Sequence, residues 1–206
     1  MFSLQDLLGQ QQGAEAVDQI SQNVGANQSA VQSAIQTALP MLINGLANNA
    51  STPEGAQSLN KALEQDHHGG ILDNLGGLSG MIFGGGDETA RQPPPKQADA
   101  GGILGHILGN NQGQVAQQVS KNSSLDIGQV SQILMFLAPI VMGYLGKRKQ
   151  QQNLGPDELS GYLGEQQQQI QASPQGGLLG NLLDRDGDGS SMDDIASMAM
   201  SYLTRK

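Results

Sequence analysis

The chain has 206 residues and a net charge of −9, with 37% apolar residues, 3% aromatic residues and no cysteine. This length fits one ordinary domain or two small ones. The few aromatic residues argue against a β-sandwich, whose strands favour such side chains, and favour helices packed through Leu, Ile, Val, Ala and Met. Without cysteine, the chain has no disulfides, thiolate metal sites or cysteine nucleophile.

The acidic balance argues against nucleic acid as a partner, because phosphate binding requires clustered Lys and Arg. The one basic cluster is Lys147, Arg148 and Lys149. We interpret it as cations beside the carbonyl end of the preceding helix, with a phosphate or membrane contact as the alternative.

The apolar stretches of the chain indicate where in the cell the protein is expected. The N-terminus lacks a positively charged region and a long apolar run, so we expect no secretory signal. The most apolar stretch, Ile133 to Leu145, has 13 residues, whereas a membrane span needs about 20. We therefore expect a cytoplasmic protein with no transmembrane segment.

The sequence repeats itself at an offset of about one hundred residues, which predicts a duplicated unit. A proline lies at the same place in both apolar runs, which chance explains poorly. The matched positions are Leu8 and Gly9 with Leu108 and Gly109, Ile20–Asn23 with Val119–Asn122, and Leu39–Leu42 with Ala138–Val141.

Each copy is predicted to form three helices, giving an all-α, multihelical bundle. The first is short and polar, at about Ala14–Val24 and Gln114–Lys121. The second is the longest, because its apolar residues recur at three- and four-residue steps. Those positions are Val31, Ile35, Leu39, Leu42 and Leu46 in one copy, and Val130, Ile133, Leu134, Leu137, Ile140, Val141 and Leu145 in the other.

Local signals set the ends of these helices. Asn27 and Asp126 stand where N-caps are expected, just ahead of the second helices. Pro53 and Pro156 each open a third helix, where the missing N–H costs little. Pro40 and Pro139, inside the second helices, are expected to bend or break them.

A stretch rich in Gly, Pro and charge, 84–96, has the composition of a flexible linker. We predict a first helical repeat at 1–83, a linker at 84–100, a second repeat at 101–175, and a C-terminal region at 176–206. Three Gly/Leu-rich boxes are expected to form helices of one or two turns, which could pair between molecules. They span Gly69–Gly76, Gly101–Gly109 and Gly176–Leu183.

An acidic loop near the C-terminus is the one segment whose spacing implies a chemistry. Asp184, Asp186 and Asp188 stand at alternate positions, Gly189 follows for a sharp turn, and Ser190 offers a backbone carbonyl. Oxygen ligands at this spacing wrap a hard cation, so we predict a Ca²⁺ site. The spacing resembles the loops of EF-hands and dockerins.

The loop departs from those families at its end, where Ile195 stands at the twelfth position in place of a carboxylate. Asp193 and Asp194 are predicted to supply the closing ligand, as in shortened EF-hand-like loops. An acidic N-cap of a terminal helix, without metal, is the alternative. Three carboxylates within five residues repel one another strongly without a cation, so Ca²⁺ is favoured.

Signals for catalysis are missing from the sequence. There is no P-loop, H-E-x-x-H, Gly-x-Ser-x-Gly or dinucleotide fingerprint. The three histidines are His67, His68 and His106, and adjacent histidines rarely face one metal from a helix. We expect a protein that is not an enzyme.

The duplicated helical units, the Pro-centred apolar helices and the Gly-Gly-Leu-Leu-Gly boxes resemble the YidB-like family of uncharacterised bacterial proteins. The resemblance covers most of 1–169, and the acidic loop looks like the tail of many members. It implies a multihelical protein with no assigned activity and no established catalytic residues.

Two functions are carried forward. The first is a non-enzymatic interaction or scaffold protein that binds itself or another protein through its apolar helical faces and Gly/Leu boxes, and that responds to calcium. The alternative is a hydrolase-like enzyme with a site assembled from scattered Asp, Glu and His. A cleft that brings together His106 and two carboxylates would favour this alternative.

Calcium binding is tested by isothermal titration of the intact protein beside a variant carrying Asp184→Ala and Asp188→Ala. We expect calcium-dependent heat and a higher melting temperature for the intact protein only, because the metal binds the folded loop. No calcium effect on either form at millimolar metal would reduce the loop to a charged cap.

Overall fold

The computed structural model of the protein describes residues 4–66, 72 and 99–172. The chain divides into two compact units, 1–164 and 165–206. No strand occurs among the described residues, which confirms the all-α class. The helices are α1 (Leu4–Leu8), α2 (Gln10–Val24), α3 (Gln28–Asn49), α4 (Pro53–Gln65), α6 (Ala100–Leu108), the 3-10 turn η3 (Gly109–Asn111), α7 (Gln112–Ser123), α8 (Ile127–Gln152) and α9 (Pro156–Gln171).

The predicted caps start the two longest helices. Asn27 Oδ1 accepts a hydrogen bond from the Ala30 N–H at 2.8 Å at the start of α3. Asp126 Oδ1 accepts from the Gln129 N–H at 2.8 Å, and the Gln129 side chain accepts from the Asp126 N–H at 3.2 Å. This capping box satisfies N–H groups that the first turn of α8 leaves without partners. Both predicted N-caps are confirmed.

Pro53 opens α4, and Pro156 opens α9, as the sequence predicted. The second Gly/Leu box forms α6, and Asp99 and Ala100, assigned to the linker, cap and begin that helix. α3 and α8 continue through Pro40 and Pro139, so of the two expected outcomes, a bend or a break, the break does not occur. The short helix α1 has no counterpart among the predicted elements.

Helix α8 is the centre of the unit 1–164. Eight consecutive residues, Phe136 to Gly143, are buried, so its middle is covered on every side. Its neighbours are α2, α3, α4, α6 and α7. A helix that is apolar all round must be enclosed by protein or lipid, and the five surrounding helices enclose this one.

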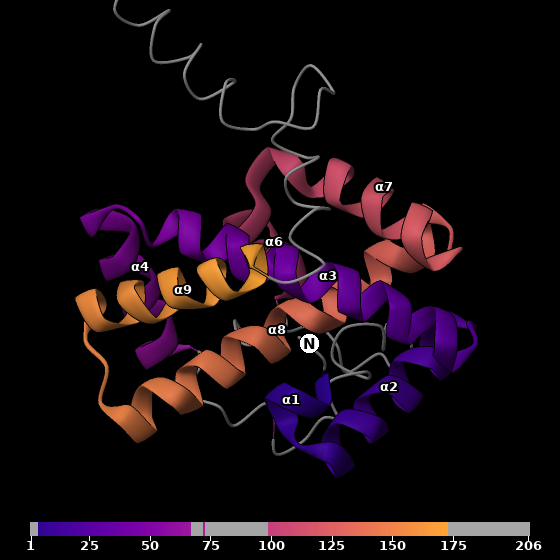
Figure 1. Ribbon diagram of the computed structural model, residues 1–206, viewed down its shortest axis with the longest axis horizontal. Helices are drawn as coiled ribbons and strands as arrows, with labels where there is room; N and C mark the ends of the chain where they lie inside the picture. The colour runs from indigo at the N-terminus through magenta and orange to yellow at the C-terminus, as the bar shows by residue number, and fades with distance from the viewer. Residues whose placement is uncertain (1–3, 67–71, 73–98, 173–206) are drawn as a thin grey trace, which may run out of the picture. The chain divides into compact units, whose positions relative to one another are not determined.

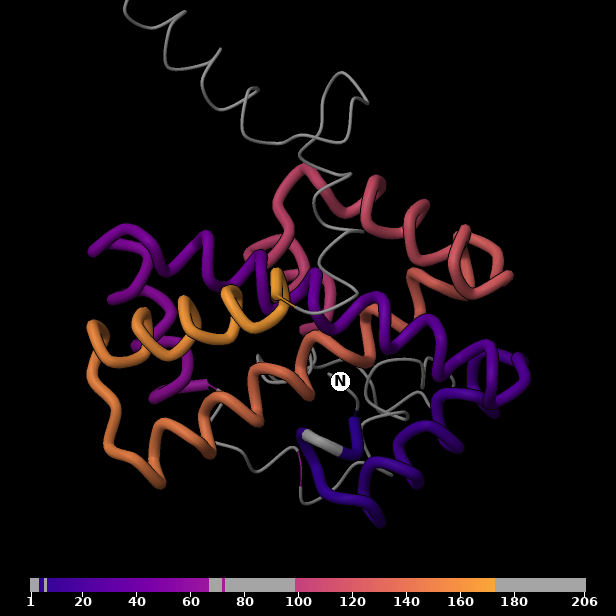
Figure 2. The backbone as a smooth tube through the Cα atoms, viewed as in Figure 1, coloured from indigo at the N-terminus to yellow at the C-terminus, as the bar shows by residue number. Residues whose placement is uncertain are grey.

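The two predicted repeats pack against each other within this unit. Figures 1 and 2 show α3, from the first half, beside α7 and α8 of the second, and these helices are in contact. Polar contacts between the halves include Ser160 Oγ to the Ala50 carbonyl at 2.8 Å and Gln129 Nε2 to the Val24 carbonyl at 3.4 Å. A common origin of the two halves stays a prediction.

In the described part of the chain, α8 alone has the length and apolar composition of a membrane span. Its most apolar 18-residue window is 61% buried inside the fold, as in core helices of soluble proteins. The helix is longer than the 13-residue apolar stretch at its middle.

Truncating the centre of α8 tests this arrangement. Leu137 is 0% exposed, so Leu137→Ala should lower the free energy of unfolding by about 2–5 kcal/mol through lost burial and a residual cavity. Ile127, at the start of the same helix, is 51% exposed, and Ile127→Ala should change it by less than about 0.5 kcal/mol. Urea unfolding followed by circular dichroism measures both. Equal losses in the two variants would contradict the central placement of α8.

Candidate functional site

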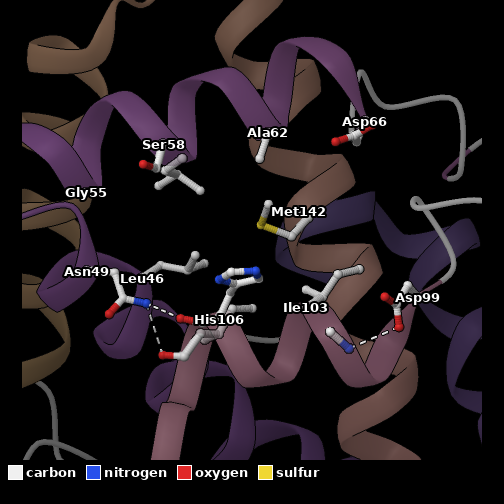
Figure 3. Close-up of a pocket in the computed structure, with 13 residues that line it drawn as sticks. Leu46, Asn49, Gly55, Ser58, Ala62, Asp66, Asp99, Ile103, His106 and Met142 are labelled. Atoms are coloured by element: carbon white, nitrogen blue, oxygen red, sulfur yellow. Dashed lines mark hydrogen bonds between the residues drawn. The ribbon is translucent and has the colours of Figure 1, made fainter.

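A pocket of about 650 Å³ lies among the C-terminal end of α3, α4, α6 and the middle of α8. This volume is within the range of about 300–1,000 Å³ typical of ligand pockets. Much of its lining is apolar, from Leu46, Leu59, Ala62, Ile103, Ile107 and Met142, and the polar lining residues include Asn49, Ser58, Asp66, Asp99 and His106. Figure 3 shows α4 on one side and α6 on the other.

Asn49, the last residue of α3, joins three helices at one end of the pocket. Its side-chain amide donates to the backbone carbonyls of His106 and Ile107, the latter at 3.3 Å. These carbonyls belong to the last turn of α6, where helices leave acceptors without partners. The Asn49 carbonyl lies so close to Gly55 of α4 that a Cβ at this position would overlap it.

Gly45 allows the close approach of α3 and α6. A Cβ at Gly45 would lie 2.6 Å from the Ile107 carbonyl oxygen, closer than side-chain carbons come to such atoms. A larger residue would therefore push α6 away from α3 and change the width of the pocket. Together with Asn49, this glycine fixes one wall of the pocket.

The pocket brings together His106, Asp66 and Asp99. Figure 3 shows the imidazole of His106 pointing into the middle of the pocket near Met142, with Asp66 and Asp99 at one end. One oxygen of Asp99 already accepts from the Gly102 N–H at 3.0 Å as the N-cap of α6. Within the described residues, the His106 imidazole has no hydrogen bond to a carboxylate, the arrangement that orients a catalytic base.

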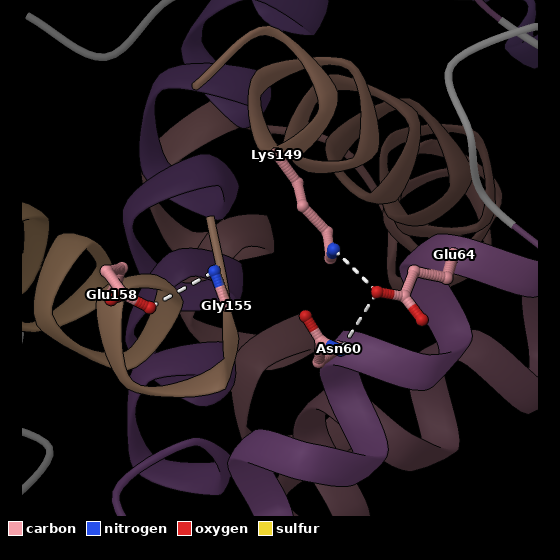
Figure 4. Close-up of polar contacts among 5 residues, drawn as sticks. All are labelled: Asn60, Glu64, Lys149, Gly155 and Glu158. Carbon is pink, nitrogen blue, oxygen red and sulfur yellow. Dashed lines mark hydrogen bonds and ion pairs between the residues drawn. The ribbon is translucent and has the colours of Figure 1, made fainter. Parts of the chain in front are cut away.

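Next to the pocket, an ion pair ties α4 to the end of α8. Lys149 Nζ lies 2.8 Å from Glu64 Oε1, and Asn60 Nδ2 donates to the same oxygen at 3.2 Å (Figure 4). The hydrogen bond from Lys149, its positive charge and the hydrogen bond from Asn60 lower the pKa of Glu64. Figure 4 also shows Glu158 accepting from the Gly155 N–H, at 3.1 Å, at the start of α9.

A family model described as "bacterial protein of unknown function (DUF937)" matches residues 6–148. The chain belongs to this family. No curated protein and no solved structure matches the chain. Every residue that lines the pocket lies between Leu46 and Met142, so the whole pocket falls inside the matched region.

The predicted calcium ligands lie outside the described residues. They are Asp184, Asp186, Asp188, Ser190, Asp193 and Asp194, and none of them falls within the family match at 6–148. His67 and His68 also lie outside the described part of the chain. In the parts that the structure does describe, no group of three or more His, Asp or Glu is placed to hold a metal.

Sequence reasoning named His106 but could not place it in one pocket with Asp66 and Asp99. It missed Asn49 altogether, because the partner carbonyls lie 57 and 58 positions further along the chain. The one local signal for this wall was the second Gly/Leu box, which becomes α6.

The charge on Lys149 should control the titration of Glu64. The pKa of Glu64 is lower in the folded chain than its ordinary value, so the ion pair forms at neutral pH and is lost as the pH falls through the lowered pKa. In Lys149→Gln, the Glu64 pKa should rise toward the ordinary value, as followed by ¹³C NMR of the side-chain carboxyl.

Lys147→Gln is the matched control, because it removes the same charge two positions away. The Glu64 titration of this control should stay close to that of the unaltered protein. Equal shifts in the two variants would show that the effect comes from net charge and not from the contact.

Proposed function

We propose that the protein is a non-enzymatic interaction or scaffold protein of the cytoplasm, which binds an apolar protein segment carrying a Lys or Arg side chain. A second copy of the chain is the first partner to test, in keeping with the expected self-association. One observation carries the proposal: a pocket of about 650 Å³ with an apolar floor and two carboxylates at one end.

The chemistry of the lining supports this choice of partner. Leu46, Ile103, Ile107 and Met142 line the pocket with apolar atoms from three helices. Each of them is at most 7% exposed, so an apolar group that enters the cavity gains packing contacts with them and removes little of their surface from water. Asp99, an exposed residue at the start of α6, places negative charge beside this floor, which favours a cation on the incoming segment. A segment with apolar residues next to Lys or Arg satisfies both demands.

The finer parts of the proposal concern the C-terminal region. We propose a calcium site at the acidic loop, from Asp184 to Asp194, that couples metal binding to association with the partner. The resemblance to the YidB-like proteins, the EF-hand-like character of the loop and the duplication of the helical unit belong to the same proposal.

An enzyme, hydrolase-like and using general acid–base chemistry, is the second candidate. The observation that favours it is the meeting of His106, Asp66 and Asp99 in one pocket. Hydrogen bonds of catalytic groups are often long before substrate binds and shorten in the complex. The unoriented imidazole and the capping role of Asp99 make it the weaker candidate.

Filling the pocket tests the interaction function. Ala62, on α4, lines the pocket, and Ala62→Trp should block it, whereas Gln57→Trp adds the same ring to the exposed side of α4. Size exclusion with light scattering over a concentration series should show self-association of the unaltered chain and of Gln57→Trp. The Ala62→Trp variant should lose this association. A monomer at all concentrations, with no partner recovered through the pocket, would refute the proposal.

Charge at the pocket end is tested by Asp99→Asn, which keeps an N-cap for α6 and removes the carboxylate. Association should weaken by roughly threefold, as expected for a partly exposed charge pair. His106→Gln separates the two candidates. The enzyme would be favoured if the unaltered chain hydrolysed an activated ester at a rate that depends on pH, and if His106→Gln abolished this activity.

A further inference from the structure

A second, smaller cleft lies away from the pocket, between α1, the start of α2 and the last turns of α8. Its volume is about 170 Å³, and its lining includes Lys147, Arg148 and Tyr144 with Leu7 and Leu8. The side-chain amides of Gln12 and Gln151 complete the polar part of the lining. Two cations, a phenol, two amides and apolar side chains thus meet in a space the size of a small molecule.

The basic residues 147–149 lie in two different environments. Lys149 lies in the last turn of α8, where its positive charge interacts favourably with the negative end of the helix dipole, and it pairs with Glu64. Lys147 and Arg148 precede that turn and have no carboxylate partner in the part of the chain that the structure describes. The interpretation as cations at the end of a helix therefore explains the position of Lys149. It does not explain Lys147 and Arg148, which line the cleft.

Arg148 is held in place while keeping hydrogen-bonding capacity. Its guanidinium lies over the ring of Tyr162, 5.2 Å from the centroid, and its Nε is buried without a hydrogen-bond partner. Because this Nε is shielded from solvent, the terminal Nη groups of Arg148 are the donors left to a ligand in the cleft. Burial, followed by the hydrogen bond with Tyr144, raises the pKa of Tyr162, so the ring beneath the guanidinium stays uncharged at neutral pH.

These features describe a receptor for an oxyanion. A stacked guanidinium is weakly hydrated and presents paired donors to carboxylate or phosphate oxygens. Lys147 adds a second charge, and the Tyr144 hydroxyl and the two amides can donate further hydrogen bonds. Leu7 and Leu8 line the cleft and favour an apolar group next to the anion.

We propose that this cleft binds a small amphipathic oxyanion, a carboxylate or phosphate monoester with a short apolar tail. The site is separate from the interaction pocket and does not depend on the function proposed for it. The same headgroup chemistry occurs on soluble metabolites and on anionic lipids, and the two sources are distinguished by the probes below.

The test measures binding of hexanoate, hexyl phosphate and hexanol to the full chain by NMR, using the side-chain amides of Gln12 and Gln151 as reporters. Both anions should saturate these shifts below about 20 mM, the range of weak specific binding, and hexanol should not. The absence of saturable shifts with either anion, or equal binding of hexanol, would overturn the proposal.

Two lysines close together in the sequence allow variants that remove the same charge inside and outside the cleft. Lys147→Gln and Lys149→Gln each remove one positive charge, yet of the two only Lys147 lines the cleft. Affinity for hexyl phosphate should fall roughly three- to tenfold in Lys147→Gln and by less than about twofold in Lys149→Gln. Equal losses of affinity in the two variants would show that binding depends on net charge and not on the cleft, and would overturn the proposal.

Gln151→Ala, at an exposed position of the same cleft, provides a variant with little risk to folding. It should also weaken binding, with an unchanged melting temperature. Sedimentation with phosphatidylglycerol vesicles, absent with phosphatidylcholine and reduced in Lys147→Gln, would identify a lipid headgroup as the source. Binding of hexyl phosphate without vesicle binding would identify a soluble ligand.

Discussion

The structure of the unit 1–164 depends on enclosing the middle of α8. The stretch from Phe136 to Gly143 exposes no side to water, so helices from both halves of the chain must cover it. Apolar packing supplies this cover, because the chain is poor in aromatic residues and its core consists mainly of aliphatic side chains. Helices α2, α3 and α4 of the first half and α6 and α7 of the second all contact α8, which explains why the two halves form a single unit.

The pocket follows from the way the covering helices end. α3 stops at Asn49, whose side chain binds the last carbonyls of α6, and α4 starts close to the same residue. The ends of α3 and α6 and the start of α4 are thereby held close together. The space between α4 and α6 is the pocket, with Met142 of α8 among its lining residues. Polar contacts at the helix ends therefore position the walls of the pocket, whereas apolar packing forms the core beneath it.

Local signals in the sequence predicted much of the fold and little of the sites. Asn27, Asp126, Pro53 and Pro156 act on N–H groups within their own first turns, so their roles follow from nearby residues. Pro139 does not break α8, because a buried helix can lose one hydrogen bond and continue when its neighbours hold it. The contacts of Asn49 with α6 and of Lys149 with Glu64 depend on how distant segments meet, which no local pattern encodes. The calcium prediction concerns residues outside those described.

The role of Asn49 also has a consequence for the chemical ageing of the protein. Asparagine side chains are thermolabile, and deamidation converts the amide to a carboxylate. An amide donates, but an ionised carboxylate only accepts, so the product would turn a negative charge toward the carbonyl oxygens of His106 and Ile107. Attraction at this junction would become repulsion, and α6 would lose its attachment to α3. A slow, uncatalysed reaction at one side chain would thus alter the wall of the pocket and loosen one of the five helices that enclose α8.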